Sequence, residues 1–176
     1  FGASIWADTI KQTKKINPEC TVEVLTPDFK GFEPALKIVF DSKPDIFSHN
    51  VECVERISKA VRAQANWQRS LGVLEKSIQH GLRTKTGIMV GLGEEVEEVK
   101  KTMRQVVDLG VQIFTIGQYL QPTKNHLKVE EYISKEQFEL YKEYGYSIGF
   151  KVVESGPLVR SSYHADEQAR MVFNNG

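Results

Sequence analysis

Residues 84–122 carry the clearest signal of the fold and read TKTGIMVGLGEEVEEVKKTMRQVVDLGVQIFTIGQYLQP. Residues 84–93 are apolar and end in glycines, which predicts a buried strand followed by a tight turn. Residues 94–110 begin with acids followed by lysines, an order that the helix dipole favours. Apolar residues recur there at helical spacing: Val96, Val99, Met103 and Val106. Because residues 111–122 form a second apolar run, the stretch predicts a strand, a helix and a further strand in parallel.

The same alternation extends through the rest of the chain. Further strands are expected at 20–29, 44–52 and 150–156, and further helices at 3–16, 32–42, 54–62, 66–81 and 135–149. Near-continuous apolar strands alternating with helices predict an α/β fold with a parallel sheet covered by helices. A doubly wound sheet and a barrel both satisfy this pattern. In either fold, function is expected at the carboxyl ends of the strands.

Composition narrows the class of protein. The chain has 176 residues, of which 40% are hydrophobic, and its 23 basic and 23 acidic residues balance. No global field therefore attracts nucleic acid or an anionic membrane, and neither is an expected partner. Cys20 and Cys53 match no metal-binding spacing and are expected to be reduced thiols in a cytoplasmic protein. Because the chain starts at Phe1 inside a helical pattern, we expect it to be a fragment.

Polar groups follow each expected strand. They are Pro27 and Asp28, then His49, Asn50 and Glu52, then Gly91 to Glu94, and then Gln118, Tyr119 and Gln121. An amide beside a carboxylate suits a ribose or an amino-acid moiety, although each residue alone could serve a loop or a cap. The GLGEE turn is neither a dinucleotide fingerprint nor a Walker A loop, and a tight turn also needs glycine. The residues alone indicate part of an α/β enzyme that binds a small polar ligand.

Several blocks of sequence together resemble the lipoyl synthase family of radical S-adenosylmethionine (SAM) enzymes. They are VEVLTPDFKG (22–31), HNVECV (49–54), RSLGVL (69–74), KTGIMVGLGE (85–94), TIGQYLQPTKNHLKVEEY (115–132) and SGPLVRSSYHADEQA (155–169). The resemblance implies a partial (β/α)6 TIM-like radical SAM barrel with strands three to six over residues 1–150. A C-terminal extension over 151–176, in the same structural domain, carries the RSSY motif.

The resemblance also implies an activity. Such enzymes are sulfurtransferases that insert two sulfur atoms, at C6 and C8 of a protein-bound octanoyl group, to form the lipoyl cofactor. They use SAM and two [4Fe–4S] clusters, each held by three cysteines. The implied partners are octanoylated lipoyl-carrier domains or the glycine cleavage H protein, and an electron donor such as ferredoxin or flavodoxin. Neither cysteine triplet is in this chain, so the chain alone is expected to be inactive.

Site residues follow from the resemblance position by position. The implied cofactor-binding residues are Gly91, Gly93 and Glu94 near the adenine, Asn50 and Glu52 near the ribose and methionine, Arg69 and Lys85 at the carboxylate, and Gln118, Leu120 and His126 around the pocket. In RSSY, Ser161 is implied as an oxygen ligand of the auxiliary cluster and Arg160 as its support. Local rules alone would make Ser161 and Ser162 helix-cap candidates, and Ser162 keeps that role.

Two alternatives stay open at this point. One is another radical SAM enzyme that inserts sulfur, similar to biotin synthase, although the RSSY ending argues against it. The other is a non-catalytic α/β module that binds a small molecule or a carrier protein.

Overall fold

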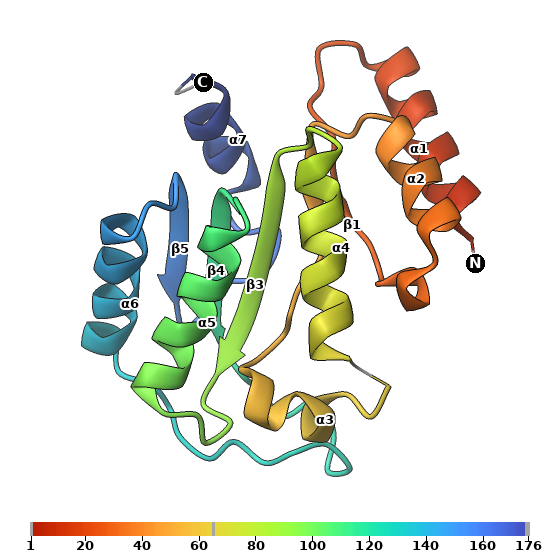
Figure 1. The fold of residues 1–176 in the computed structure, drawn as a ribbon. Helices are drawn as coiled ribbons and strands as arrows, with labels where there is room; N and C mark the ends of the chain where they lie inside the picture. The colour runs from red at the N-terminus through yellow and green to blue at the C-terminus, as the bar shows by residue number, and fades with distance from the viewer. Residues whose placement is uncertain (1, 65, 175–176) are drawn as a thin grey trace.

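One parallel sheet forms the centre of the molecule. The computed structural model describes residues 2–64 and 66–174, so Phe1, Ala65 and the last two residues of the expected extension lie outside the described residues. Within that part, one sheet contains β1 (Glu23–Leu25), β2 (Ile46–Ser48), β3 (Thr84–Val90), β4 (Ile113–Gln118) and β5 (Val152–Gly156). Every neighbouring pair is parallel, and the strands lie in chain order. Their carboxyl ends therefore meet at one end of the sheet, at the bottom of Figure 1.

Helices cover one face of this sheet. They are α1 (Ala3–Ile16), α2 (Glu33–Asp41), α4 (Trp67–Gln79), α5 (Val96–Asp108) and α6 (Lys135–Ser147). Apolar residues of α4, α5 and α6 form one core with β3, β4 and β5, and those of α1 and α2 form a second core with β1 and β2. Figure 1 shows α4 and α5 in front of the sheet and α6 beside β5 at its left edge. None of the described helices combines the length and apolar character that crossing a bilayer requires.

The strand order decides between the two folds that the sequence left open. A doubly wound sheet reverses its strand order and carries crossover helices on both faces. Here the order is sequential and the crossover helices share one face, which is the arrangement of a barrel wall. Among the described residues, β1 and β5 do not pair with each other, so the barrel is partial, as predicted. The five strands match the five apolar runs of the sequence, one more than the four that the resemblance implied.

The opposite, inner face of the sheet is covered only in part by helix. The helix α7 (Ala165–Asn174) packs Ala169 and Val172 against Ile46, Ile113 and Val152, near the amino ends of the strands. Figure 1 places it at the upper end of the sheet, near the C-terminus. The inner face towards the carboxyl ends is left to the loops.

Local sequence holds the loops at the carboxyl ends in place. The short helices η1 (Phe29–Gly31), η2 (Glu55–Ile57) and α3 (Ser58–Val61) follow β1 and β2. A capping box of Glu95 and Glu98 begins α5. Arg56 of η2 reaches it, with Nε 2.7 Å from Glu98 Oε1, and its hydrogen bond lowers the pKa of Glu98 to about 2. The chain after β2 is thereby fixed to the start of α5.

Candidate functional site

A cavity of about 220 Å³ lies on the inner face at the carboxyl ends of the strands. It is lined by Asn50, Glu52, Gly87, Ile88, Met89, Thr115, Gly117, Gln118, Leu120, Val159, Arg160 and Ser161. The structure thus brings together six of the residues predicted from the sequence: Asn50, Glu52, Gln118, Leu120, Arg160 and Ser161. These six come from three separate parts of the chain, which meet only in the folded structure.

The amide of Asn50 and the carboxylate of Glu52 line one side of the cavity. Glu52 has a left-handed backbone with φ of 73° and is held beside β3, where its N–H donates to Gly87 O at 3.1 Å. The buried Oδ1 of Asn50 has no hydrogen-bond partner among the described residues. An unpartnered buried acceptor is costly, so it marks a place where a ligand can donate a hydrogen bond.

The carboxylate of Glu52 is electrostatically unusual. Burial raises its pKa, and Arg62 opposes this rise only in part, with Nη1 3.5 Å from Glu52 Oε1. Other residues of the chain therefore stabilise the ionised form of Glu52 only weakly. A cationic ligand would stabilise it by filling the space in front of it.

Two glycines allow neighbouring groups to pack closely around the cavity. A Cβ on Gly87 would lie 2.1 Å from Thr115 Oγ1, and one on Gly117 would lie 2.3 Å from Val159 O. Both distances are far below van der Waals contact, so these positions accept only glycine without a shift of their neighbours. At Gly117 the neighbour is backbone of the C-terminal segment, which crosses the inner face there. Thr115, Gly117 and Val159 are cavity residues that the sequence analysis missed, although the period of two along β4 could have placed Thr115 and Gly117 on one face.

The predicted residues after β3 serve the loop itself. Glu94 accepts hydrogen bonds from the N–H of Gly91 at 2.5 Å and of Leu92 at 2.9 Å. Gln118 is also engaged, since its Nε2 donates to Glu131 O at 3.0 Å and its Oε1 accepts from Ile133 N at 2.9 Å. Gly91, Gly93 and Glu94 do not line the cavity, and their contact with a cofactor stays a prediction.

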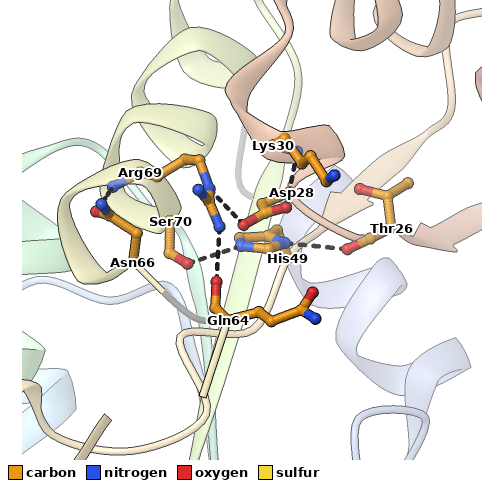
Figure 2. Close-up of polar contacts among 8 residues, drawn as sticks. All are labelled: Thr26, Asp28, Lys30, His49, Gln64, Asn66, Arg69 and Ser70. Atoms are coloured by element: carbon orange, nitrogen blue, oxygen red, sulfur yellow. Dashed lines mark hydrogen bonds and ion pairs between the residues drawn. The ribbon is translucent and has the colours of Figure 1, made fainter. Parts of the chain in front are cut away.

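Arg69 lies in a different polar network, shown in Figure 2. Its Nε donates to Asp28 Oδ2 at 2.6 Å and its Nη2 to Gln64 O at 2.9 Å. Burial alone would raise the pKa of Asp28, but hydrogen bonds from the Lys30 backbone and from Arg69 outweigh it and hold that pKa below its usual value. Arg69 is absent from the lining of the cavity, so its role at the cofactor carboxylate stays a prediction.

His49 lies buried beside that network and has its own hydrogen-bond partners. Its Nδ1 lies 3.0 Å from Thr26 O and its Nε2 lies 3.1 Å from Ser70 Oγ, which joins the ends of β1 and β2 to α4. Burial lowers the pKa of His49, and the hydrogen bond with Thr26 only partly offsets this. The neutral imidazole is therefore a structural link between three elements.

Two further predicted residues lie away from the cavity lining. His126 is exposed in the loop after β4, with Nδ1 2.9 Å from Thr123 Oγ1. Lys85 is fully buried on β3 and contacts Glu23 and the main chain of Ser161. Their cofactor contacts stay predictions.

Among residues 2–64 and 66–174, no group of three or more His, Cys, Asp or Glu side chains could hold a metal ion. Cys20 is exposed and Cys53 is buried, and burial raises the pKa of the Cys53 thiol to about 12. The described residues therefore do not provide a three-cysteine cluster site.

The inner-face site at the strand ends and the partial barrel define a class of protein. The chain belongs to the Radical SAM superfamily, whose family model matches residues 4–106. Membership implies SAM and [4Fe–4S] chemistry. The chain is 54% identical over 169 residues to a lipoyl synthase of Rubrobacter xylanophilus, and 52% identical over 170 residues to one of Phocaeicola vulgatus. These matches cover 95% and 97% of this chain but 53% and 60% of the relatives, so the chain spans a little over half their length.

Solved structures share the fold. A domain of pyruvate-formate lyase-activating enzyme from Bacteroides vulgatus matches with a TM-score of 0.66 and 11% identity, covering 88% of this chain and 91% of that one. A methylornithine synthase matches with a TM-score of 0.64 and 10% identity, covering 89% and 53%. At these identities the likeness supports the fold alone.

Proposed function

We propose that this chain is the part of a lipoyl synthase that binds SAM and covers it with the RSSY segment. The whole enzyme would insert two sulfur atoms, at C6 and C8 of a protein-bound octanoyl group. The observation that carries the proposal is the cavity, because Asn50 and Glu52 face it together with Arg160 and Ser161 of the RSSY motif. The identity of about half the residues with lipoyl synthases supports the same reading.

The cavity residues fit SAM in their chemistry. Asn50 offers the unpartnered Oδ1 to a ribose hydroxyl or an ammonium group. Glu52 offers a half-buried carboxylate to the positive charge of the cofactor, which would relieve the cost of ionising it. Gly87 and Gly117 leave room for Thr115 Oγ1 and for the Val159 carbonyl, and both of those residues line the cavity. When bound, SAM supplies the radical chemistry that removes hydrogen from unreactive carbon.

The clusters do not fit the two cysteines of this chain, so no step through a cluster is derived from these residues. Ser161 as an oxygen ligand of an auxiliary cluster remains part of the proposal, supported by its place beside the cavity. Its test is Ser161→Ala in the whole protein: normal iron content and normal sulfur insertion would refute the ligand role.

The partners of the whole protein also belong to the proposal. The substrate would be an octanoylated lipoyl-carrier domain or the glycine cleavage H protein, and the reductant a ferredoxin or flavodoxin. The cytoplasmic location expected from the cysteines is proposed with them.

The decisive experiment combines binding and product analysis on the anaerobically prepared whole protein. Asn50→Ala and Glu52→Gln should each weaken SAM binding about tenfold or more, since each removes a hydrogen-bonding or charged partner from a buried site. Lys76→Met is the control, because Lys76 pairs with Glu33 on the outer surface at 3.0 Å. An octanoylated carrier peptide should gain two sulfur atoms. Unchanged affinity in both variants, or no lipoyl product, would overturn the proposal.

A further inference from the structure

Lys85 is a buried cation that the cavity does not use. Its side chain is 0% exposed, and it lies on β3 two residues before Gly87, on the same face of the strand. Its ammonium Nζ lies 2.9 Å from Glu23 Oε1 and donates to Ser161 O at 2.6 Å. A buried ammonium needs partners for both its charge and its three donors.

Glu23 supplies the opposite charge from two strands away. The register pairs Glu23 with Ile46 and Ser48 with Lys85, so the carboxylate reaches Lys85 across β2. Its side chain is 18% exposed, so the ion pair lies at the inner surface and not within the helix-side core. Because Glu23 already balances the charge, the contact with Ser161 is an additional contact made to a loop.

Among the described residues, a few other hydrogen bonds hold the main chain of that loop, one of them from the Gln168 side chain of α7 to Tyr163 O. Val159 N donates to Gly156 O at 3.1 Å and Tyr163 N donates to Arg160 O at 3.0 Å, which are turns within the segment. Val159 O lies against Gly117, a contact that positions the segment by shape. The hydrogen bond from Lys85 is charge-assisted and joins the segment to the central strand, 76 residues earlier in the chain.

We propose that Lys85 is a positioning residue, which clamps the main chain of Ser161 to the inner face of the barrel while Glu23 holds its charge. The clamp would fix the RSSY segment beside the cavity before any cofactor is bound. The clamp stands on geometry alone, whereas its consequence for catalysis rests on the proposed function. The proposal concerns the contacts of Lys85 with Glu23 and Ser161, and the expected contact of Lys85 with a cofactor carboxylate stays a separate prediction.

The test is hydrogen exchange of the whole protein, followed by mass spectrometry of peptides that cover 157–164. The double variant Glu23→Leu/Lys85→Met removes both charges, so no buried ion is left unpaired. The matched control is Glu33→Leu/Lys76→Met, which removes a surface pair of similar length, 3.0 Å, between α2 and α4. We expect the rate of amide exchange in 157–164 to rise about tenfold or more in the first variant only. That variant lacks the hydrogen bond from a charged group that opposes local opening of the segment.

A second measurement separates positioning from cofactor binding. In the Glu23→Leu/Lys85→Met variant, the dissociation constant of SAM should stay within about twofold of the parent value. Its turnover number should fall, and its KM for SAM should be unchanged. Unchanged exchange in 157–164, or an equal rise across β3 and β4, would overturn the clamp. Lost SAM affinity with unchanged exchange would assign Lys85 to the cofactor instead. If the double variant does not fold, Lys85→Gln loses the charge but keeps a neutral donor, so a smaller rise confined to 157–164 is expected, and no rise there would overturn the clamp. If the parent forms no lipoyl product, the exchange result still decides the clamp.

Discussion

The replacement Gly117→Ala should push the RSSY segment off the inner face of the sheet. The new Cβ would lie 2.3 Å from Val159 O, whereas ordinary contact begins at 3.4 Å, so the two backbones must separate by about 1 Å. Overpacking of this kind costs about 1–3 kcal/mol. In a domain of 150–250 residues that lowers the melting temperature by about 2–12 °C, and the shift is smaller in a longer whole protein. Because Gly117 and Val159 both line the cavity, SAM affinity should fall as well.

The matched control is Gly72→Ala on α4, where a Cβ would meet no atom within 4 Å. Alanine inside a helix is favoured over glycine by about 0.5–1 kcal/mol, so this variant should melt slightly higher than the parent. Calorimetry and SAM titration of the whole protein measure both effects. A Gly117→Ala variant with the parent melting temperature and affinity would refute the assigned close approach.

Three further outcomes follow from the buried groups. Glu52→Gln should raise the melting temperature near neutral pH. Burial raises the pKa of Glu52, so the ionised carboxylate destabilises the fold above its usual pKa. The gain in melting temperature should vanish near pH 4, and an equal gain at all pH values would contradict this. Burial lowers the pKa of His49, so the melting temperature should decline as the pH falls below about 6.5. In His49→Gln the melting temperature should depend less on pH over this range. Parallel pH profiles of the two proteins would count against this. Iodoacetamide should label exposed Cys20 and spare buried Cys53, whose pKa burial raises to about 12, and equal labelling by mass spectrometry would contradict the assignment.

The order of strands and helices was predictable because apolar periodicity is a local property. The strand expected at 84–93 is β3 (Thr84–Val90), and the helix expected at 94–110 is α5 (Val96–Asp108). The choice between a barrel and a doubly wound sheet was not predictable from the pattern. It depends on which face each crossover helix covers and on the strand order, and both folds share the same local signals.

The candidate site was predictable in part for a similar reason. Asn50 and Glu52 follow a parallel strand, and the ends of parallel strands meet, so their place beside the cavity follows from chain order. Arg69 was expected at a cofactor carboxylate, which stays a prediction, and its guanidinium is bound by Asp28 and the Gln64 carbonyl outside the cavity lining. The direction of a long side chain depends on partners that are distant in sequence, and no spacing rule contains them.

The parallel α/β alternation, the polar residues at the strand ends and the likeness to lipoyl synthases could all be read from the amino-acid sequence. The partial barrel that the resemblance implied is confirmed by the strand order, whereas the contacts of Gly117 with the C-terminal segment and of Lys85 with Ser161 were visible only in the folded molecule. The two kinds of feature differ in the sequence separation over which their interactions act. Strand and helix preferences arise from neighbouring residues, whereas a buried ammonium is satisfied by whichever carboxylate and carbonyl the fold brings within hydrogen-bond distance.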